Sequence, residues 1–497
     1  MRVPNAPYRQ LWPIPAQRGC AVAALLLFAM GANAQVQTAP ADPVPFSAAP
    51  VPGDGSLNWT TGAGRSYLIP AIEVPGFLAA LSIVDRITIP HDVYDSTLKS
   101  TWGFVHEQHW VFDTDPFSMN QLGHPYQGAT MFAFARSAGV PFWQSLAYNT
   151  TGSFIWKMAG ETDLPSINDQ ITTSVAGALL GESLFRMASL ILEHGGEHPE
   201  LWREWAAATL SPPTGFNRLM FGKKFKAVFP GYDPAIFMRL RFGGEVDANT
   251  TTQGVSHPTA REEGVIDFTL EYGLPGKKGY AYDRPFDYFS FEFAGQANMK
   301  NLIEDIMVRG LLYGTDYSLG ENFRGIQGIY GSYDYISPSI FRVSSSAVSY
   351  GTTGQWWISR KVALQGTALA GGGFAGAGTI PVSNGLRDYH YGLTPQGLLA
   401  LRAIFGKMVM LDLAAREYYV SGTGSDDAKG SEQIFRGEVG LTYRVFEQQA
   451  LGIQFVESNR HAHYQHLTDT NQSEGTFSLV YTFLAKSGFG RVEWRNQ

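Results

Sequence analysis

A short polar stretch near residue 120 carries the side-chain types that acid–base chemistry needs. The sequence NQLGHPYQG places Asn120 four residues before His124, and the preceding DTDP supplies Asp113 and Asp115. A histidine beside carboxylates can act as a general base or bind a metal ion. The stretch is therefore a candidate active site.

Structural roles explain the same residues. Gly123 and Pro125 favour an extended turn, which would leave His124 capping the free N–H groups of the next helix. Asp113 and Asp115, in a turn before a proline, are common turn formers. We interpret the stretch mainly as a packing element and keep the site as the alternative.

Other ionisable residues follow within the next sixty positions. Arg136, near the end of its expected helix, could pair with Glu161, Asp169 or Glu182. Glu182 and Arg186 form an i,i+4 pair. The candidate acid–base residues are His124, Asp113, Glu161 and Glu182, and the candidate binding residues are Asn120, Arg136, Asn168, Asp169 and Arg186. We expect no metal site and no cofactor, because the recognised hydrolase and phosphate-loop patterns do not occur.

These residues belong to a section, about 68–210, with helical patterning. Pro125 and Gly139 bracket one helix, and a second runs from Pro141 to about residue 159. Ser166 and Asp169 resemble a capping box that begins a long helix ending at 195–196. Within it, Gly177 and Gly181 predict the close approach of another backbone.

The first residues resemble an export signal. Three arginines precede the apolar run AVAALLLFAM and the small-residue site ANA, so we expect cleavage after residue 34. Cys20 is the only cysteine of the chain, which excludes disulfides in the processed protein. The net charge of −7 argues against nucleic-acid binding, which needs a basic face.

From about residue 233 the hydrophobic pattern changes to a period of two. In 435–446, apolar Phe435, Leu441 and Tyr443 alternate with Arg436 and Arg444. Such alternation indicates strands with one apolar and one polar face. Charged residues are only 16%, glycines number 55, and we found no second apolar run of spanning length. This composition favours a protein that crosses a membrane as strands.

The spacing of the strands predicts a barrel. We count about twelve, an even number as bacterial outer-membrane barrels require. Short connections at 351–354, 405–407 and 447–449 would face the periplasm, and long ones at 246–262, 372–387, 421–432 and 461–473 would lie outside. The polar faces predict a lumen of mixed charge, lined by Arg239, Arg241, Glu292, Arg436, Glu438 and Arg444. The segment after Phe483 is either a periplasmic stub or holds further structure over 489–494.

Several spaced motifs carry a resemblance to a known family. The runs WVFDTDPFSMNQLGHPYQG, FARSAG, LPSINDQ, ALLGESLFR and SPPTGFNRLMFG, with GIYGSYDY and FRVSSSAVSYG further on, are similar to those of Gram-negative outer-membrane proteins. In that uncharacterised family, a helical domain of unknown function precedes a β-barrel. The resemblance implies location and architecture, and it transfers no catalytic residue.

The fold we expect is therefore mixed, with an N-terminal helical domain followed by an antiparallel transmembrane β-barrel. The segments are a signal peptide (1–34), a Pro/Ala-rich linker (35–60), the helical domain (61–222) as plug or periplasmic cap, the barrel (223–484) and a C-terminal tail (485–497). The leading functional hypothesis is a plugged or gated transport conduit in the outer membrane. The alternatives are an enzyme acting on an envelope lipid or glycan, and a structural role with a periplasmic partner. Outer-membrane lipid and the barrel-insertion machinery are the other expected partners.

Overall fold

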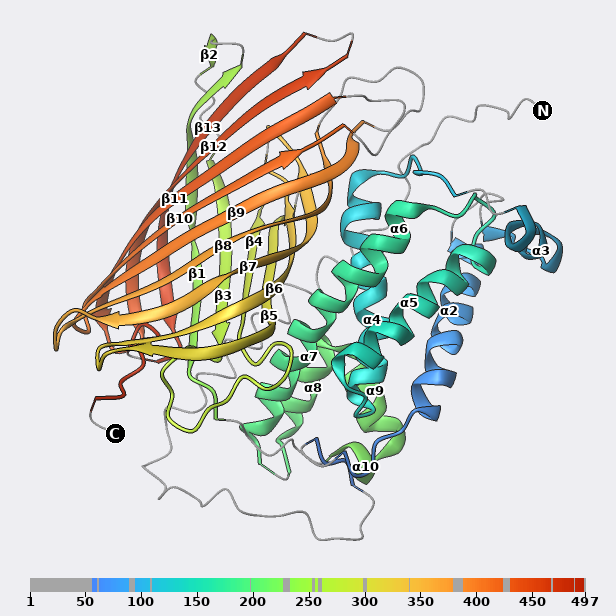
Figure 1. Cartoon of the computed structure of the whole chain (residues 1–497), viewed down its shortest axis with the longest axis horizontal. Helices are drawn as coiled ribbons and strands as arrows, with labels where there is room; N and C mark the ends of the chain where they lie inside the picture. The colour runs from blue at the N-terminus through green and yellow to red at the C-terminus, as the bar shows by residue number, and fades with distance from the viewer. Residues whose placement is uncertain are drawn as a thin grey trace. The chain divides into compact units, whose positions relative to one another are not determined.

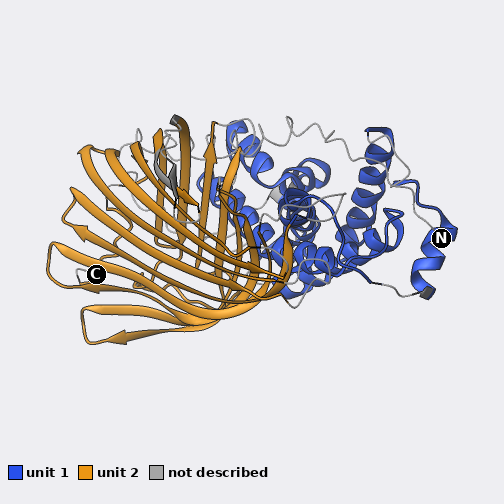
Figure 2. Ribbon diagram, turned by 90° about the horizontal axis from the view of Figure 1, so that it is seen from above, with its two compact units in different colours: residues 1–230, 380–388 blue, residues 231–379, 389–497 orange. Residues whose placement is uncertain are grey.

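A computed structural model of the chain describes residues 56–59, 62–88, 94–107, 110–196, 198–226, 233–252, 255–257, 262–297, 302–338, 340–378, 388–422, 430–465, 468–486 and 488–495. The expected signal peptide lies outside the described residues. The chain divides into two compact units (Figure 2), residues 1–230 with 380–388 and residues 231–379 with 389–497. We call them the helical unit and the barrel unit.

The helical unit consists of α-helices and two short π-helices (Figure 1). The elements are α2 (Leu68–Thr88), α3 (Leu98–Glu107), η2 (Met119–Gly123), α4 (His124–Ser137), α5 (Phe142–Ala159), α6 (Ile167–Ile171), η3 (Thr172–Ala176), α7 (Gly177–Glu193), α8 (Leu201–Leu210), α9 (Pro212–Phe221) and α10 (Lys223–Lys226). The expected helices after Pro125 and Pro141 are confirmed as α4 and α5. The long helix expected after Ser166 is the continuous run α6–η3–α7.

Helices α4 and α7 pack at glycine contacts. A Cβ atom at Gly128 would lie 1.9 Å from the Thr173 carbonyl oxygen, and one at Gly177 would lie 2.7 Å from the Gly128 Cα. A Cβ atom at Gly181 would meet the Ala129 oxygen at 2.9 Å. The predicted close approach at Gly177 and Gly181 is confirmed, and it explains why glycine is kept inside a helix despite its cost.

Two details of the helical unit differ from the predictions. The residues between Asn120 and His124 form the π-helix η2, which continues directly into α4, and the predicted extended turn is wrong. Two helical stretches, Leu68–Thr88 and Ile167–Glu193, are also long and apolar enough to cross a bilayer by length and composition. The second is 89% buried over its apolar window, as a core helix would be.

The barrel unit is a closed antiparallel ring of twelve strands plus one short extra strand, β2 (Val255–His257), which pairs with β1. The ring consists of β1 (Ile236–Thr252), β3 (Glu262–Tyr272), β4 (Phe289–Gln296), β5 (Ile303–Leu319), β6 (Phe323–Ile336), β7 (Val343–Trp357), β8 (Val362–Ala377), β9 (His390–Phe405), β10 (Val409–Val420), β11 (Gly430–Phe446), β12 (Gln449–Tyr464) and β13 (Thr470–Leu484). Pairing of β13 with β1, for example Leu240 with Phe483, closes the ring. Closure pairs the edge strands, which a structure inside lipid requires.

The two ends of the barrel have different connections. One end, the turn end, holds the start of β1, the end of β13 and the short turns 320–322, 358–361, 406–408 and 447–448. It also holds the long connection 273–288, which breaks the expected asymmetry. The other end, the loop end, carries the longer connections. The turn predicted at 351–354 is wrong because those residues lie inside β7, and the strands extend further into the predicted outer loops.

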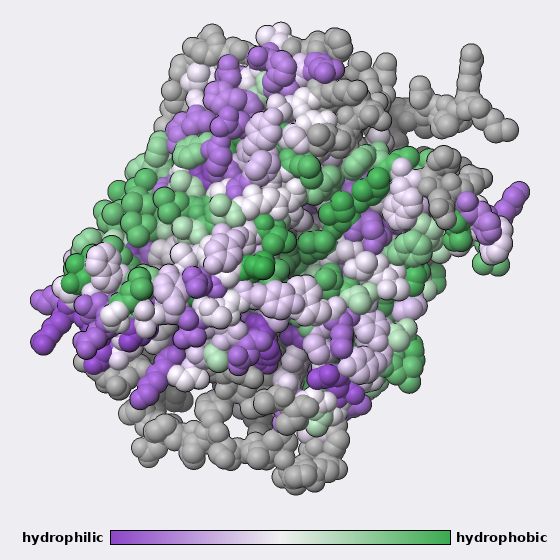
Figure 3. Space-filling model, viewed as in Figure 1, coloured by the Kyte–Doolittle hydropathy of each residue, from purple (hydrophilic) through white to green (hydrophobic). Residues whose placement is uncertain are grey.

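The outward faces of the strands are apolar and the inward faces are polar. On β11, Leu441 is 40% exposed and Tyr443 is 52% exposed, whereas Thr442 is fully buried and Arg436 and Arg444 are nearly so. Hydrophobic residues gather over the middle of the visible strand surface, with hydrophilic residues toward the strand ends (Figure 3). This arrangement is the inverse of a soluble core and matches a barrel that faces lipid.

Candidate functional site

Asp169 on α6 is the centre of a buried polar cluster in the helical unit. His124, the first residue of α4, places Nε2 at 3.2 Å from Asp169 Oδ2. Lys157 of α5 contacts the same carboxylate, and the Ser166 hydroxyl donates a hydrogen bond to it over 2.5 Å. The Asp169 side chain is completely buried. Because a buried lone charge costs several kcal/mol, these partners are what allow Asp169 to stay ionised.

Two asparagines extend this cluster to Asp113. The Asn120 amide donates to Asp113 Oδ1, and Asn168 Oδ1 accepts a hydrogen bond from the Asp113 backbone N–H at 3.1 Å. The Asn168 amide then donates to Asp169 Oδ1 at 2.7 Å. Glu161, four residues after Lys157 on the chain, accepts from its ammonium group. Six of the candidate residues are thus brought together in space: Asn120 on η2, His124 on α4, Asn168 and Asp169 on α6, and Asp113 and Glu161 in the connections before η2 and after α5.

Burial and neighbouring charges set the protonation states of the cluster. Burial and the Asp169 carboxylate raise the pKa of Asp113 to about 8. Burial opposes the charged form of His124, but the attraction of Asp169 outweighs it and raises the His124 pKa to about 9. Burial likewise opposes ionised Asp169, but His124 and Lys157 hold its pKa well below the usual value. At neutral pH the imidazole is therefore cationic, which disfavours a role as general base.

Glu182 on α7 is the centre of a second buried cluster. Arg136 donates to it twice, from Nε over 2.5 Å and from Nη2 over 2.9 Å, while Arg186 Nε donates over 2.9 Å. Arg136 also donates to the Val140 carbonyl at 2.7 Å and lies 4.0 Å from the ring centroid of Trp59. Burial opposes ionised Glu182, but the two arginines lower its pKa. This bidentate, satisfied geometry is typical of a structural ion pair.

The structure thus divides the nine candidate residues between two clusters. Arg136 pairs with Glu182 among the three predicted partners, and the Glu182–Arg186 pair is buried. The predicted capping roles are wrong: neither His124 nor Ser166 makes a side-chain cap, and Asp169 turns toward the cations. Sequence reasoning missed Lys157, although its i,i+4 spacing to Glu161 was a usable signal.

The barrel lumen holds a belt of ion pairs that cross it. Arg402 of β9 donates to Glu271 of β3 at 2.9 Å, and Arg416 of β10 donates to Glu292 of β4 at 2.8 Å. Each pair joins strands that are six steps apart in either direction around the ring. The walls therefore approach each other closely along this line, and the side chains fill the space between them.

A third cross-lumen pair and several lateral pairs complete the belt. Arg436 of β11 donates to Asp305 of β5 at 2.9 Å, again between strands six steps apart. Asp412 accepts from Arg239 and from Arg402, both at 2.7 Å. The guanidinium groups are thereby shared among several carboxylates. The predicted inward positions of Arg239, Arg241, Glu292, Arg436, Glu438 and Arg444 are confirmed.

Apolar layers lie beyond the belt toward both ends. Toward the turn end, Phe489 and Val492 pack in a buried cluster with side chains of the strands, so the segment after β13 does hold structure. Toward the loop end, Ile340 and Phe341 from the β6–β7 connection pack in a buried cluster with strand residues such as Ile336 and Ile434. The lumen in this form is therefore largely filled.

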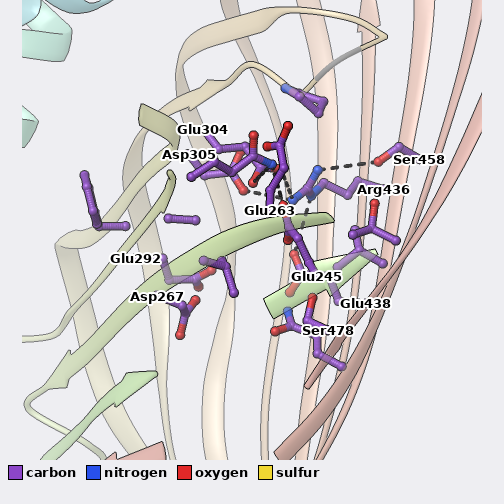
Figure 4. Close-up of a pocket in the computed structure, with 18 of the residues that line it drawn as sticks. Glu245, Glu263, Asp267, Glu292, Glu304, Asp305, Arg436, Glu438, Ser458 and Ser478 are labelled. Carbon is purple, nitrogen blue, oxygen red and sulfur yellow. Dashed lines mark hydrogen bonds and ion pairs between the residues drawn. The ribbon is translucent and has the colours of Figure 1, made fainter. Parts of the chain in front are cut away.

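A cavity of about 70 Å³ remains in the loop-end half of the lumen (Figure 4). This space would hold on the order of five waters. Its lining has an excess of carboxylates over guanidinium groups: Glu245, Glu263, Asp267, Glu292, Glu304, Asp305, Glu438 and Glu474 against Arg239 and Arg436. Gln296 Nε2 donates to Glu245 and to Glu304, at 2.7 and 3.0 Å. Five of these carboxylates pair with arginines: Asp267 with Arg239, Glu292 and Glu438 with Arg416, and Glu304 and Asp305 with Arg436.

Sequence reasoning missed about half of these lumen residues. Asp267, Glu271, Glu304, Asp305, Arg402, Asp412 and Arg416 were not singled out. Their signal was charged residues an even number of positions apart on an otherwise apolar strand, which places them on one face, as for Asp412 and Arg416 on β10. The cross-lumen partners are far apart in sequence and only the ring closure brings them together.

Comparison with known families identifies part of the helical unit. Residues 109–213 match the family described as "Domain of unknown function (DUF3943)". The match includes both buried clusters apart from Trp59. The DUF3943 segment thus precedes the barrel, as the resemblance implied. No curated protein matches the chain.

Comparison with solved structures gives outer-membrane channels. The NanC porin is 10% identical with a TM-score of 0.26, over 50% of this chain and 98% of that one. An outer membrane channel from Pseudomonas putida F1 is 10% identical with a TM-score of 0.27, over 50% and 95%. The channel DcaP of Acinetobacter baumannii is 7% identical with a TM-score of 0.23, over 50% and 96%. At these TM-scores and identities the likeness carries no conclusion about function.

Proposed function

We propose that this protein is an outer-membrane conduit for small cationic solutes, and that the described form is its closed state. The observation that carries the proposal is the closed ring with an apolar outer face and a charged interior, which would place a polar path across lipid. A barrel that served only as an anchor would not need the eight buried arginines that the described strands carry. Shared ion pairs can instead separate and re-form around a passing ion.

The orientation follows from the connections. Short turns face the periplasm in bacterial barrels, and longer loops face outward. The turn end would then be periplasmic, and the acidic cavity would lie on the outer side of the ion-pair belt. The cavity and the apolar layer with Ile340 and Phe341 both lie toward the loop end, so a solute arriving from outside would reach them before the belt.

The charge of the cavity supports a preference for cations. The lining carries eight carboxylates, of which five pair with arginines, and a concave surface with this acidic excess and low-dielectric walls favours positive ions over negative ones. Glu245 and Glu263 are directly paired neighbours on β1 and β3, where ladder register brings their backbones together. Both line the cavity, so this pair is the natural position at which to change the selectivity.

The experiment is the reversal potential of the purified protein in planar bilayers under a KCl gradient. We expect a cation-selective reversal potential, which shifts toward zero in the E245Q/E263Q variant. E447Q, at an exposed residue of the turn 447–448, is the matched control and should not change it. Anion selectivity, or an unchanged potential in E245Q/E263Q, would contradict the cation preference.

A further inference from the structure

Residues 488–495, here called the tail segment, occupy the turn-end mouth of the barrel. The segment has the sequence GFGRVEWR and follows β13. Phe489 is fully buried and Val492 is 5% exposed. Their apolar surroundings are the buried side chains of Phe237, Leu274, Tyr288, Leu311, Ile326, Tyr330, Trp357, Ile404, Met410 and Leu484. The mouth therefore provides an apolar receptor for a segment that belongs to no strand.

Side chains of the wall bind the backbone of the tail segment. Gln355 of β7 accepts a hydrogen bond from the Val492 N–H at 2.8 Å and donates one to the Val492 carbonyl at 2.7 Å. Trp357 Nε1 donates to the same carbonyl at 3.0 Å, and Gln365 donates to the Gly490 carbonyl at 2.9 Å. A side-chain amide has both a donor and an acceptor, so Gln355 satisfies the N–H and the carbonyl of Val492 together.

The polar residues of the segment bind the carbonyl groups of three turns. Arg491 Nη1 donates to the Gly406 oxygen at 2.6 Å, and Trp494 Nε1 donates to the Glu321 oxygen at 2.8 Å. Arg495 donates to the Ser359 oxygen at 3.3 Å and stacks 4.0 Å from the Trp357 ring centroid. These contacts span the turns 320–322, 358–361 and 406–408. The segment thus crosses the mouth from wall to wall.

Local geometry fits the segment to its position. Gly490 has φ +77°, and a Cβ atom there would lie 2.6 Å from the Phe237 Cβ. Phe489 also has a positive φ of 52°, which costs energy for a non-glycine residue. Such backbone persists only where surrounding contacts hold it. The receptor in the mouth supplies those contacts, including the Arg444 guanidinium 4.5 Å from the Phe489 ring centroid.

We propose that the turn-end mouth is a peptide-binding site, and that the tail segment is its resident ligand and a removable stopper of the lumen. The ligand class is a short peptide that follows the spacing of the tail segment. It has an aromatic residue, an aliphatic residue three positions later and, after one further residue, Trp-Arg. Removal breaks no strand ladder, because all the contacts above involve side chains or turns. The stopper role rests on the proposed conduit, whereas peptide binding at the mouth does not.

The binding site is tested by thiol accessibility. In a C20S background, V492C should react with a membrane-impermeant thiol reagent about tenfold or more slower than K361C, because labelling requires local opening. Lys361 is an exposed turn residue at the same end. Adding G490A should raise the V492C rate severalfold. Equal rates at V492C and K361C would overturn the proposal.

The stopper role is tested with a deletion and a peptide. Deleting residues 487–497 should raise bilayer conductance severalfold while barrel migration on unheated gels stays normal. A peptide of residues 487–497 should reverse the effect from one side of the bilayer only, and the same peptide with Phe489→Ala and Trp494→Ala should not. Equal conductance before and after deletion would overturn the stopper. If no variant showed conductance, the proposed conduit would be wrong. The rate of V492C labelling would still test whether the mouth binds the tail segment.

Discussion

Arg416 and Glu292 form a 2.8 Å ion pair across the barrel lumen, between strands on opposite sides of the ring. Arg416 also donates to Glu438 at 2.8 Å, and its side chain is 3% exposed. One guanidinium therefore holds two carboxylates and joins two walls. This relationship makes the lumen both charged and closed, and it provides the position at which the wall-to-wall contact can be removed.

Removing only the cation of this pair should be strongly destabilising. R416A leaves two carboxylates without their main partner in the lumen, a change that typically costs about 3–5 kcal/mol. R416Q/E292Q removes both charges of the cross-lumen pair and should cost much less. The measurement is the temperature at which the barrel loses its heat-modifiable gel migration. If R416A and R416Q/E292Q lost equal thermal stability, unpaired buried carboxylates would not be the cause of the destabilisation.

The apolar outer face predicts a different sensitivity to charge. L441R introduces an arginine on the outward face of β11, where a lipid-facing cation costs about 2–4 kcal/mol near the bilayer midplane. E447R, in the adjacent turn, is the control and should be tolerated. The measurement is urea-dependent folding into lipid vesicles. If L441R folded as well as E447R, the outer face would not be the lipid-facing one.

The packing of α4 against α7 predicts a size limit at Gly128. G128A would place a methyl carbon 1.9 Å from a backbone oxygen and must separate the helices, which should destabilise the helical unit by several kcal/mol. G76A on α2 meets nothing within 4 Å and should stabilise it by up to about 1 kcal/mol, because alanine is the better helix former. Thermal loss of circular dichroism at 222 nm measures both. A tolerated G128A would contradict the packing.

The Asp169 cluster predicts a pH dependence of the helical unit. The pKa of His124 is raised to about 9. The contribution of this histidine to folding stability is fully present below its ordinary pKa of 6.5 and is lost as the pH rises through 9. The pKa of Asp113 is raised to about 8. Its contribution to the stability of the folded helical unit is therefore also lost as the pH rises, between 3.8 and 8. The charged and titratable groups that interact with His124 are Asp169, Lys157, Glu161 and Asp115.

Unfolding midpoints at 222 nm should therefore fall between pH 6.5 and 9. H124Q should be less stable at pH 6.5 and should show a smaller fall. An increase in stability over this interval would contradict the assigned charges. H124Q also separates a structural role from the enzyme hypothesis, because a buried structural residue changes the midpoint without removing any activity of the folded protein.

The sequence allowed the barrel to be predicted because alternation is a local signal. Leu441, Thr442 and Tyr443 reveal the two faces of β11 without knowledge of its neighbours. The cross-lumen partners could not be predicted, since Arg416 and Glu292 meet only after twelve strands close. Structure over 489–494 was one of the two alternatives for the segment after Phe483, but its position in the barrel mouth was not predicted, for a related reason. Its contacts are with turns and with Gln355, which carry no periodic pattern.

The candidate residues of the helical unit do lie in buried clusters, but the predicted turn and capping contacts around them are not found. His124, Asp113 and Asp169 do come together, because polar residues inside apolar helices need one another. The π-helix over 119–123 was not predicted, because Gly123 and Pro125 favoured an extended turn there; within it, the Asn120 amide donates to Asp113. It turns His124 away from a cap and toward Asp169.

The central claim is that a charged lumen, closed by ion pairs between opposite walls, crosses the membrane. The most direct measurement is bilayer conductance of R416Q/E292Q in the chain that lacks residues 487–497, beside the same shortened chain with Arg416 and Glu292 intact, with equal insertion confirmed for both. The account predicts more frequent, cation-selective openings when the ion pair is removed as well as the tail segment. Absence of conductance from both, or identical conductance, would contradict it.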